Sequence, residues 1–157
     1  RHSFPTRRSS DLGYAGLPEA ASALLRLATS ADERKTARAR LRRALRELGR
    51  FARIFPIARP RYFLWRGYAH WLFRQSRRAL WCLRLSLHLG VKLEMSYEEA
   101  LTRLMLGQLG ARKHGGLRID REMARRHLRA AAQIFQRLGA KNELDQAQRL
   151  IDSERSD

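Results

Sequence analysis

The stretch from Pro60 to Gly90 constrains the fold most, because it carries two apolar stripes with helical spacing and a short break between them. All three tryptophans, Trp65, Trp71 and Trp81, fall within it, and the break lies near Gln75. Two amphipathic helices joined so tightly form a hairpin, whose remaining apolar surface needs further helices to cover it. The stretch therefore predicts an all-α fold with helical neighbours on both sides of the hairpin.

Apolar residues at spacings of three and four predict helices along the rest of the chain. We expect helices over residues 17–29, 31–55, 61–73, 76–89, 96–109, 120–138 and 142–151. Pro18 is placed in the first turn of its helix, where the missing N–H costs little. Ser30 and Ser96 each begin a capping-box pattern, and Gly90 and Gly139 are expected as left-handed residues that end helices.

The charge of the chain raises the question of an anionic partner. The formal net charge is +18, and 29 of the 33 basic residues are arginine. Such an excess favours nucleic acid or an anionic membrane as a partner. However, the basic residues are spread over nearly every expected helix, and arginine without lysine is typical of a GC-rich genome. We therefore expect neither partner, and an Arg-rich helical nucleic-acid-binding module is the alternative function.

The residue types needed for catalysis or metal binding do not form a constellation. Cys82 is the only cysteine, so neither an intrachain disulfide nor a cysteine-based metal site can form. His70, His88, His114 and His127 lack the i, i+4 pairing of a helical metal site. No nucleophile–base pair occurs, so we predict no enzyme, no catalytic or metal-binding residue and no cofactor. A free thiol suits a reducing cytoplasmic setting.

Two further features invite a functional interpretation. Glu98 and Glu99 resemble an acid pair, but adjacent helical residues point away from each other. The basic, glycine-rich loop from Gly110 to Ile119 could hold a phosphate, yet it lacks the Lys-Ser/Thr of a P-loop. We expect this loop to be an insertion between repeat helices.

The first twelve residues, RHSFPTRRSSDL, match neither the periodicity nor the composition of the rest. They resemble the conceptual translation of a short-read sequencing adapter, which predicts a non-native segment at 1–12 and a missing true N-terminus. Without the charges of Arg1, Arg7, Arg8 and Asp11 the net charge falls from +18 to +16. The basic character does not depend on this segment.

A repeated pattern of small residues follows the two glycines Gly67 and Gly107. Ala79, Leu83 and Ser86 follow the first with the spacing A-x₃-L-x₂-S, and Ala124, Leu128 and Ala131 follow the second with A-x₃-L-x₂-A. Small residues at such positions let two helices approach closely, and the pattern resembles a degenerate tetratricopeptide array.

Three longer stretches carry a more specific resemblance: FPIARPR (55–61), LGVKLEMSYEEA (89–100) and HLRAAAQIFQRLGAKNEL (127–144). They are similar to the tetratricopeptide-like C-terminal tail of bacterial multidomain signalling proteins, in which a cyclase or Ser/Thr kinase domain precedes an AAA-type ATPase module. The resemblance implies stacked antiparallel helical hairpins over 13–153, a solenoid fragment, followed by a frayed tail at 154–157. It implies a non-catalytic interaction or regulatory scaffold.

A tetratricopeptide-like stack presents its first helices to a concave groove that binds peptides or neighbouring domains. In this register Arg61, Tyr68 and Trp71 line the groove and are the candidate partner-binding residues, with Trp71 the most exposed of the three tryptophans. The expected partner is a protein or peptide, or another domain of the same parent chain. A solenoid cut at its N-terminal side exposes an apolar end that could also pair two copies.

Overall fold

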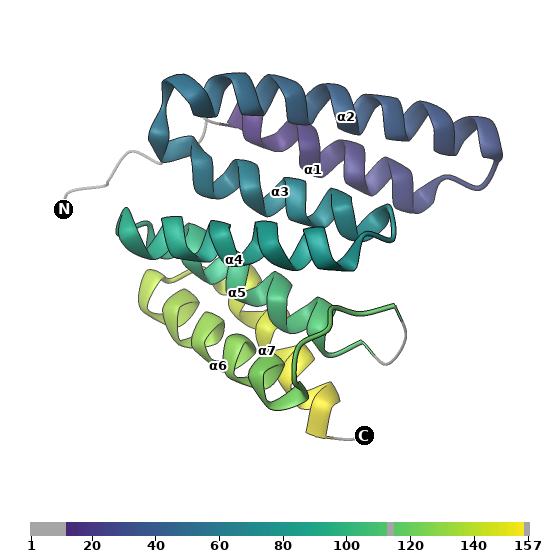
Figure 1. Ribbon diagram of the computed structural model, residues 1–157. Helices are drawn as coiled ribbons and strands as arrows, with labels where there is room; N and C mark the ends of the chain where they lie inside the picture. Colours follow the sequence, from purple (N-terminus) through teal and green to yellow (C-terminus); the bar gives the residue numbers. More distant parts are fainter. Residues whose placement is uncertain (1–11, 113–114, 156–157) are drawn as a thin grey trace. The chain divides into compact units, whose positions relative to one another are not determined.

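The computed structural model describes residues 12–112 and 115–155, which form helices and no strand (Figure 1). The all-α fold class is confirmed for this part of the chain. The described elements are α1 (Leu12–Leu27), α2 (Ala31–Ile54), the 3₁₀-helix η1 (Pro56–Ala58), α3 (Arg59–Leu72), α4 (Ser76–Lys92), α5 (Ser96–Gly110), α6 (Arg121–Leu138) and α7 (Lys141–Arg155). The adapter-like segment lies outside the described residues except for Leu12, where α1 begins.

The chain divides into two compact units, Arg1–Ala58 and Arg59–Asp157. The first contains α1, α2 and η1, and the second contains α3 to α7. The region expected as one continuous array thus comprises a helical pair and a larger five-helix unit.

In the first unit, α2 packs along α1. Ser30 begins α2 as predicted, since its hydroxyl accepts from the N–H of Glu33 (3.1 Å) and the Glu33 carboxylate accepts from the N–H of Ser30 (3.2 Å). The pKa of Glu33 is lowered because its carboxylate accepts hydrogen bonds from the backbone N–H of Thr29 and then from that of Ser30. The buried stripe of α2 has the predicted spacing, with Ala37, Leu41, Ala44, Leu48 and Ala52.

The start of α1 differs from the expectation. Pro18 lies inside the helix rather than in its first turn, because α1 begins at Leu12. The buried hydroxyl of Ser22 donates to the carbonyl oxygen of Pro18 at 2.7 Å. Pro18 therefore lies inside α1, where its missing N–H leaves one backbone hydrogen bond of the helix unformed.

The five-helix unit repeats one close contact in two places. A Cβ added to Gly67 would lie 3.0 Å from Leu83 Cδ2 and 3.2 Å from the carbonyl oxygen of Ala79. At Gly107 the matching distances, to Leu128 and Ala124, are 2.6 and 3.0 Å. The glycines therefore bring α3 onto α4 and α5 onto α6 in the same way, at the residues that the repeat pattern singled out.

A third small residue continues this series in α7. Ala147 lies as many residues beyond Gly107 as Gly107 lies beyond Gly67, and its side chain is fully buried. Around it packs a core of α5, α6 and α7 residues that includes Leu104, Leu128 and Phe135. A small side chain at this position again accommodates close helix packing.

A buried polar contact joins the first three helices of this unit. The Ser86 hydroxyl of α4 donates to the carbonyl oxygen of Pro60 in α3 (2.7 Å) and lies 2.8 Å from the Thr102 hydroxyl of α5. Both hydroxyls are inaccessible to solvent. Ser86 is the position at which the repeat pattern predicted a small residue, and here the small residue also supplies a hydrogen bond.

Two helix ends differ from the sequence expectation. Gly90 does not end α4: it lies inside the helix, where an added Cβ would be 3.3 Å from the backbone nitrogen of Glu99 in α5. The left-handed residue after α4 is Glu94, with φ 54°. Ser96 forms no capping box, because it is the first helical residue and the Glu99 carboxylate binds Arg103 (2.8 Å) instead. Gly139, with φ 69°, ends α6 as predicted.

The expected frayed tail is helical over its described part. α7 continues to Arg155, and Glu154 is 9% exposed. Its carboxylate lies 3.6 Å from Arg125 and 3.7 Å from Arg121, both on α6. These ion pairs hold the end of α7 against α6. None of the helices in the described residues is long and apolar enough to cross a membrane.

Candidate partner-binding surface

The three residues expected to contact a partner, Arg61, Tyr68 and Trp71, all lie on α3. α3 packs against α5 as well as α4, so one side of α3 continues onto α5. The surrounding contacts divide this side into a charged end at Arg61 and an aromatic end at Trp71.

At the charged end, Arg61 is part of a clamp between helices. Its guanidinium binds the Glu98 carboxylate of α5 at 2.7 Å, with the two side chains 22% and 17% exposed. The same guanidinium lies 5.8 Å from the centre of the Tyr97 ring. Its Nε is buried and has no hydrogen-bond partner among the described residues.

The clamp continues from α5 to α7 through Tyr97. The Tyr97 hydroxyl donates to the Glu143 carboxylate at 2.7 Å, and its ring packs edge-on against Phe135. Burial, followed by this hydrogen bond, raises the pKa of Tyr97 to about 12. Arg61, Glu98, Tyr97 and Glu143 therefore connect α3, α5 and α7 by side chains alone.

At the aromatic end, three rings follow one another along α3. Trp65 packs edge-on against Tyr68 (5.9 Å between ring centres), and Tyr68 stacks on Trp71 at 5.5 Å with an interplanar angle of 21°. Tyr68 is buried and Trp71 is partly buried. The indole Nε1 of Trp65 is buried with no partner among the described atoms.

The loop after α5 covers Trp71. The indole N–H of Trp71 donates to the carbonyl oxygen of Gly115 at 2.7 Å, and the Arg112 guanidinium lies 4.9 Å from the Trp71 ring centre. Leu117 is buried in one cluster with Leu64 and Tyr68. The segment expected to be only an insertion thus forms part of the core of this unit and contacts a candidate binding residue.

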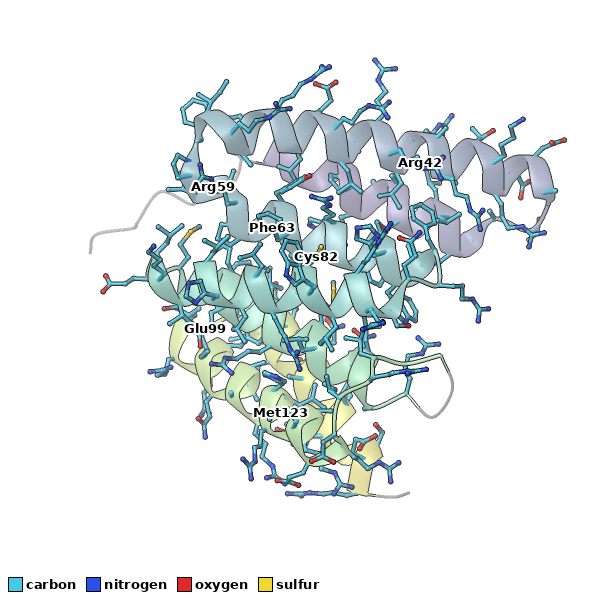
Figure 2. All side chains as sticks on the ribbon, in the orientation of Figure 1. Arg42, Arg59, Phe63, Cys82, Glu99 and Met123 are labelled. Atoms are coloured by element: carbon cyan, nitrogen blue, oxygen red, sulfur yellow. The ribbon has the colours of Figure 1, made fainter. Side chains whose placement is uncertain are left out.

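The exposed tryptophan is Trp81, not Trp71 as expected. Trp81 is 60% exposed and packs edge-on against Phe63 of α3, which Figure 2 labels. Of the residues that follow Trp81 in α4, Cys82 and Leu83 are buried. The buried residues of α4 lie on one side of the helix, and Trp81 is not on that side.

The titratable residues serve structure within the described parts. Glu98 and Glu99 bind different arginines, as their adjacent positions predicted. Burial lowers the pKa of His70, whose Nδ1 lies 2.7 Å from Gln75 Oε1, and that of His127 beside Arg103. Burial raises the pKa of the Cys82 thiol. Among residues 12–112 and 115–155, no three His, Cys, Asp or Glu side chains cluster as metal ligands would.

Sequence reasoning missed most partners of the candidate residues. Glu98 was considered only as one of an apparent acid pair, Arg112 and Leu117 only as parts of a loop, and Tyr97 and Glu143 had no assigned role. A signal existed for the acidic residues, since a basic chain has few carboxylates and each has many arginines to bind.

Comparisons with protein-family models, with curated proteins and with solved structures give no match for this chain.

Proposed function

We propose that this chain is a non-catalytic interaction scaffold in which α3 to α7 form a short tetratricopeptide-like stack. The observation that carries the proposal is the repeated glycine contact, Gly67 on Leu83 and Gly107 on Leu128. One helix–helix contact used twice, with a third small residue at Ala147, is typical of a repeat array. Arrays of this kind act by presenting a continuous side chain surface to a partner.

The bound partner is an extended peptide or a segment of a neighbouring domain, at the α3–α5 side. The stacked Tyr68 and Trp71 rings suit an apolar side chain of such a peptide. Arg112 and the carbonyl oxygen of Gly115 lie against Trp71, so a peptide that reaches this ring must displace the Gly115 contact. Loss of the contact between Gly115 and Trp71 then signals to the rest of the chain that a peptide is bound.

The parent protein, in this proposal, is a cytoplasmic bacterial signalling protein with an AAA-type ATPase and a cyclase or kinase domain. The support is the resemblance of residues 55–61, 89–100 and 127–144 to the tail of such proteins. The scaffold would report partner binding to those domains. Leu24 and Leu27, exposed on α1, are the apolar surface through which a second copy would associate.

A peptide-display selection on the whole chain tests the binding surface. Selected peptides should bind the wild type and the Trp81→Ala variant equally, and should lose at least about tenfold in affinity with Trp71→Ala, the scale of a buried aromatic anchor. Trp81→Ala is the matched control because it removes an exposed tryptophan of the same unit. Circular dichroism establishes that both variants are folded. Peptides that bind all three proteins alike, or that need Trp81, would refute the assignment.

A further inference from the structure

The first unit concentrates positive charge on α2. This helix has nine basic and three acidic residues among 24, and every basic side chain is exposed. These are Arg34, Lys35, Arg38, Arg40, Arg42, Arg43, Arg46, Arg50 and Arg53. The net charge of α2 is therefore +6. Of its three carboxylates, Glu33 is engaged in the helix cap and Glu47 binds Arg50 at 3.2 Å.

The basic residues form an ordered row on α2. Lys35, Arg42, Arg46 and Arg53 are spaced by seven, four and seven residues, so they fall on one line of a helix with 3.6 residues per turn. Arg38 flanks the row on one side and Arg50, Arg43 flank it on the other. At 1.5 Å per residue the row is about 27 Å long. Figure 2 shows long basic side chains projecting along α2, with Arg42 labelled near the middle.

The second unit differs, because its carboxylates are distributed among its arginines. Glu98 binds Arg61, Glu99 binds Arg103, and Glu154 lies between Arg121 and Arg125. In the sequence alone, the basic residues are too widely spread to predict a binding surface. That expectation fits α3 to α7, but the first unit gathers its excess on the exposed side of one helix.

We propose that the basic row of α2, with its flanking arginines, binds the phosphate backbone of double-stranded nucleic acid without sequence preference. Arginine binds phosphate through two parallel hydrogen bonds, and each strand of a duplex presents one phosphate for about every 3.4 Å of the duplex axis. The row therefore spans about eight base pairs. Cations on both flanks suit the two backbones that border a groove, which a helix enters.

The composition of the row favours a duplex over the other polyanions. No aromatic residue occurs between Arg34 and Arg50, so α2 offers no platform for the unstacked bases of a single strand. An interfacial membrane helix needs a free apolar face, whereas the apolar stripe of α2 is buried. Ile54, Phe55 and Ile57 are exposed beyond Arg53, and a membrane partner would require them.

The test is fluorescence anisotropy of the whole chain with labelled duplexes of about 20 base pairs, more than twice the length of the row. DNA and RNA duplexes of two unrelated sequences should bind, and the difference between DNA and RNA identifies the source of the phosphates. The variant Lys35→Gln/Arg42→Gln/Arg46→Gln/Arg53→Gln should reduce the magnitude of the slope of log K against log salt by up to about 3.6. If all four contact phosphates, affinity falls by up to about 4,000-fold at 0.1 M salt.

The control variant Arg77→Gln/Arg84→Gln/Arg137→Gln/Arg149→Gln removes the same charge from exposed positions of the second unit. It should retain most of the affinity and the salt slope, since its changes lie off the row. Equal losses in the two variants would show that only net charge matters and overturn the proposal. So would absence of duplex binding by the wild type, or tighter binding to a single strand.

Anionic phosphatidylserine vesicles provide the remaining arm. Vesicle binding that is lost in Phe55→Ser/Ile57→Ser, together with no binding to either duplex, would identify a membrane partner and overturn the proposal. Duplex binding that this variant retains in full supports it, because the row is then sufficient.

Discussion

Replacing Gly107 by alanine sets two opposing energies against each other. Alanine in place of glycine inside an exposed helix stabilises it by about 1 kcal/mol. At Gly107, however, the added Cβ lies 2.6 Å from Leu128 Cδ2 and 3.0 Å from the carbonyl oxygen of Ala124. Carbon atoms in ordinary contact are about 3.5–4.0 Å apart, so α5 and α6 must separate or Leu128 must leave its rotamer.

The structure predicts that the clash outweighs the helix propensity. Overpacking typically costs about 1–3 kcal/mol, and the backbone oxygen cannot move aside as a flexible side chain can. We therefore expect Gly107→Ala to lower the free energy of unfolding by about 2 kcal/mol. At Gly67 the corresponding distances are 3.0 and 3.2 Å, so Gly67→Ala should cost less, about 1 kcal/mol or below.

Urea unfolding followed by far-ultraviolet circular dichroism measures both variants. The double variant Gly107→Ala/Leu128→Ala provides the control, because removal of the leucine also removes the clash. Its loss should fall short of the sum of the single losses by about 0.5–3 kcal/mol, the range for residues in contact. A Gly107→Ala protein more stable than the wild type would refute the close approach of α5 and α6.

Three further changes test other contacts. Ser86→Ala removes the hydrogen bond to the buried carbonyl oxygen of Pro60 and the contact with the Thr102 hydroxyl, which keeps its bond to the carbonyl oxygen of Glu98. It should cost about 1 kcal/mol in the same urea assay, whereas Ser153→Ala, at an exposed hydroxyl, should change little. The folded-state pKa of Tyr97 is raised to about 12, so its contribution to stability is fully present below the unfolded pKa of about 10 and is lost as pH rises from about 10 to 12. In Tyr97→Phe the urea midpoint of unfolding should therefore depend less on pH over this window. A pH profile identical to that of the wild type would contradict the burial of Tyr97. Glu154→Ala removes the carboxylate that faces Arg121 and Arg125 and should lower the melting temperature by several degrees. Asp145→Ala, at an exposed position of the same helix, serves as control. Equal and negligible effects of the two variants would support the sequence-based expectation that the tail is frayed.

Sequence periodicity was sufficient for the helices because each carries its own signal. The capping box at Ser30 and the glycine at Gly139 were predicted correctly, since both depend on residues within three or four positions. Ser96 failed for a local reason that the pattern does not encode: Glu99 has Arg103 one turn ahead, and the ion pair takes the carboxylate. The prediction at Gly90 was wrong because this glycine permits the close approach of α5, a contact that the local sequence does not reveal.

The candidate surface could be predicted only in part. The register of the repeat placed Arg61, Tyr68 and Trp71 on one helix, and that placement needs only their spacing. Their partners lie far away in the sequence: Glu98 is 37 residues beyond Arg61, and the Gly115 carbonyl that binds Trp71 is 44 residues beyond it. Exposure was misjudged at Trp71 and Trp81 because the loop after α5 covers the former, and a loop without periodicity gives no indication of where it packs.

The sequence by itself therefore determined the all-α class, most helix positions and the residues at which two pairs of helices meet. Gly67 with Leu83, and Gly107 with Leu128, were recognisable because a glycine inside an apolar helical pattern sacrifices stability unless it permits close packing. Only the tertiary structure decided which side chains remain exposed. Burial depends on what packs against a helix. Only the packing therefore showed that every basic side chain of α2 is exposed beside a buried apolar stripe, and that Trp81 rather than Trp71 is exposed.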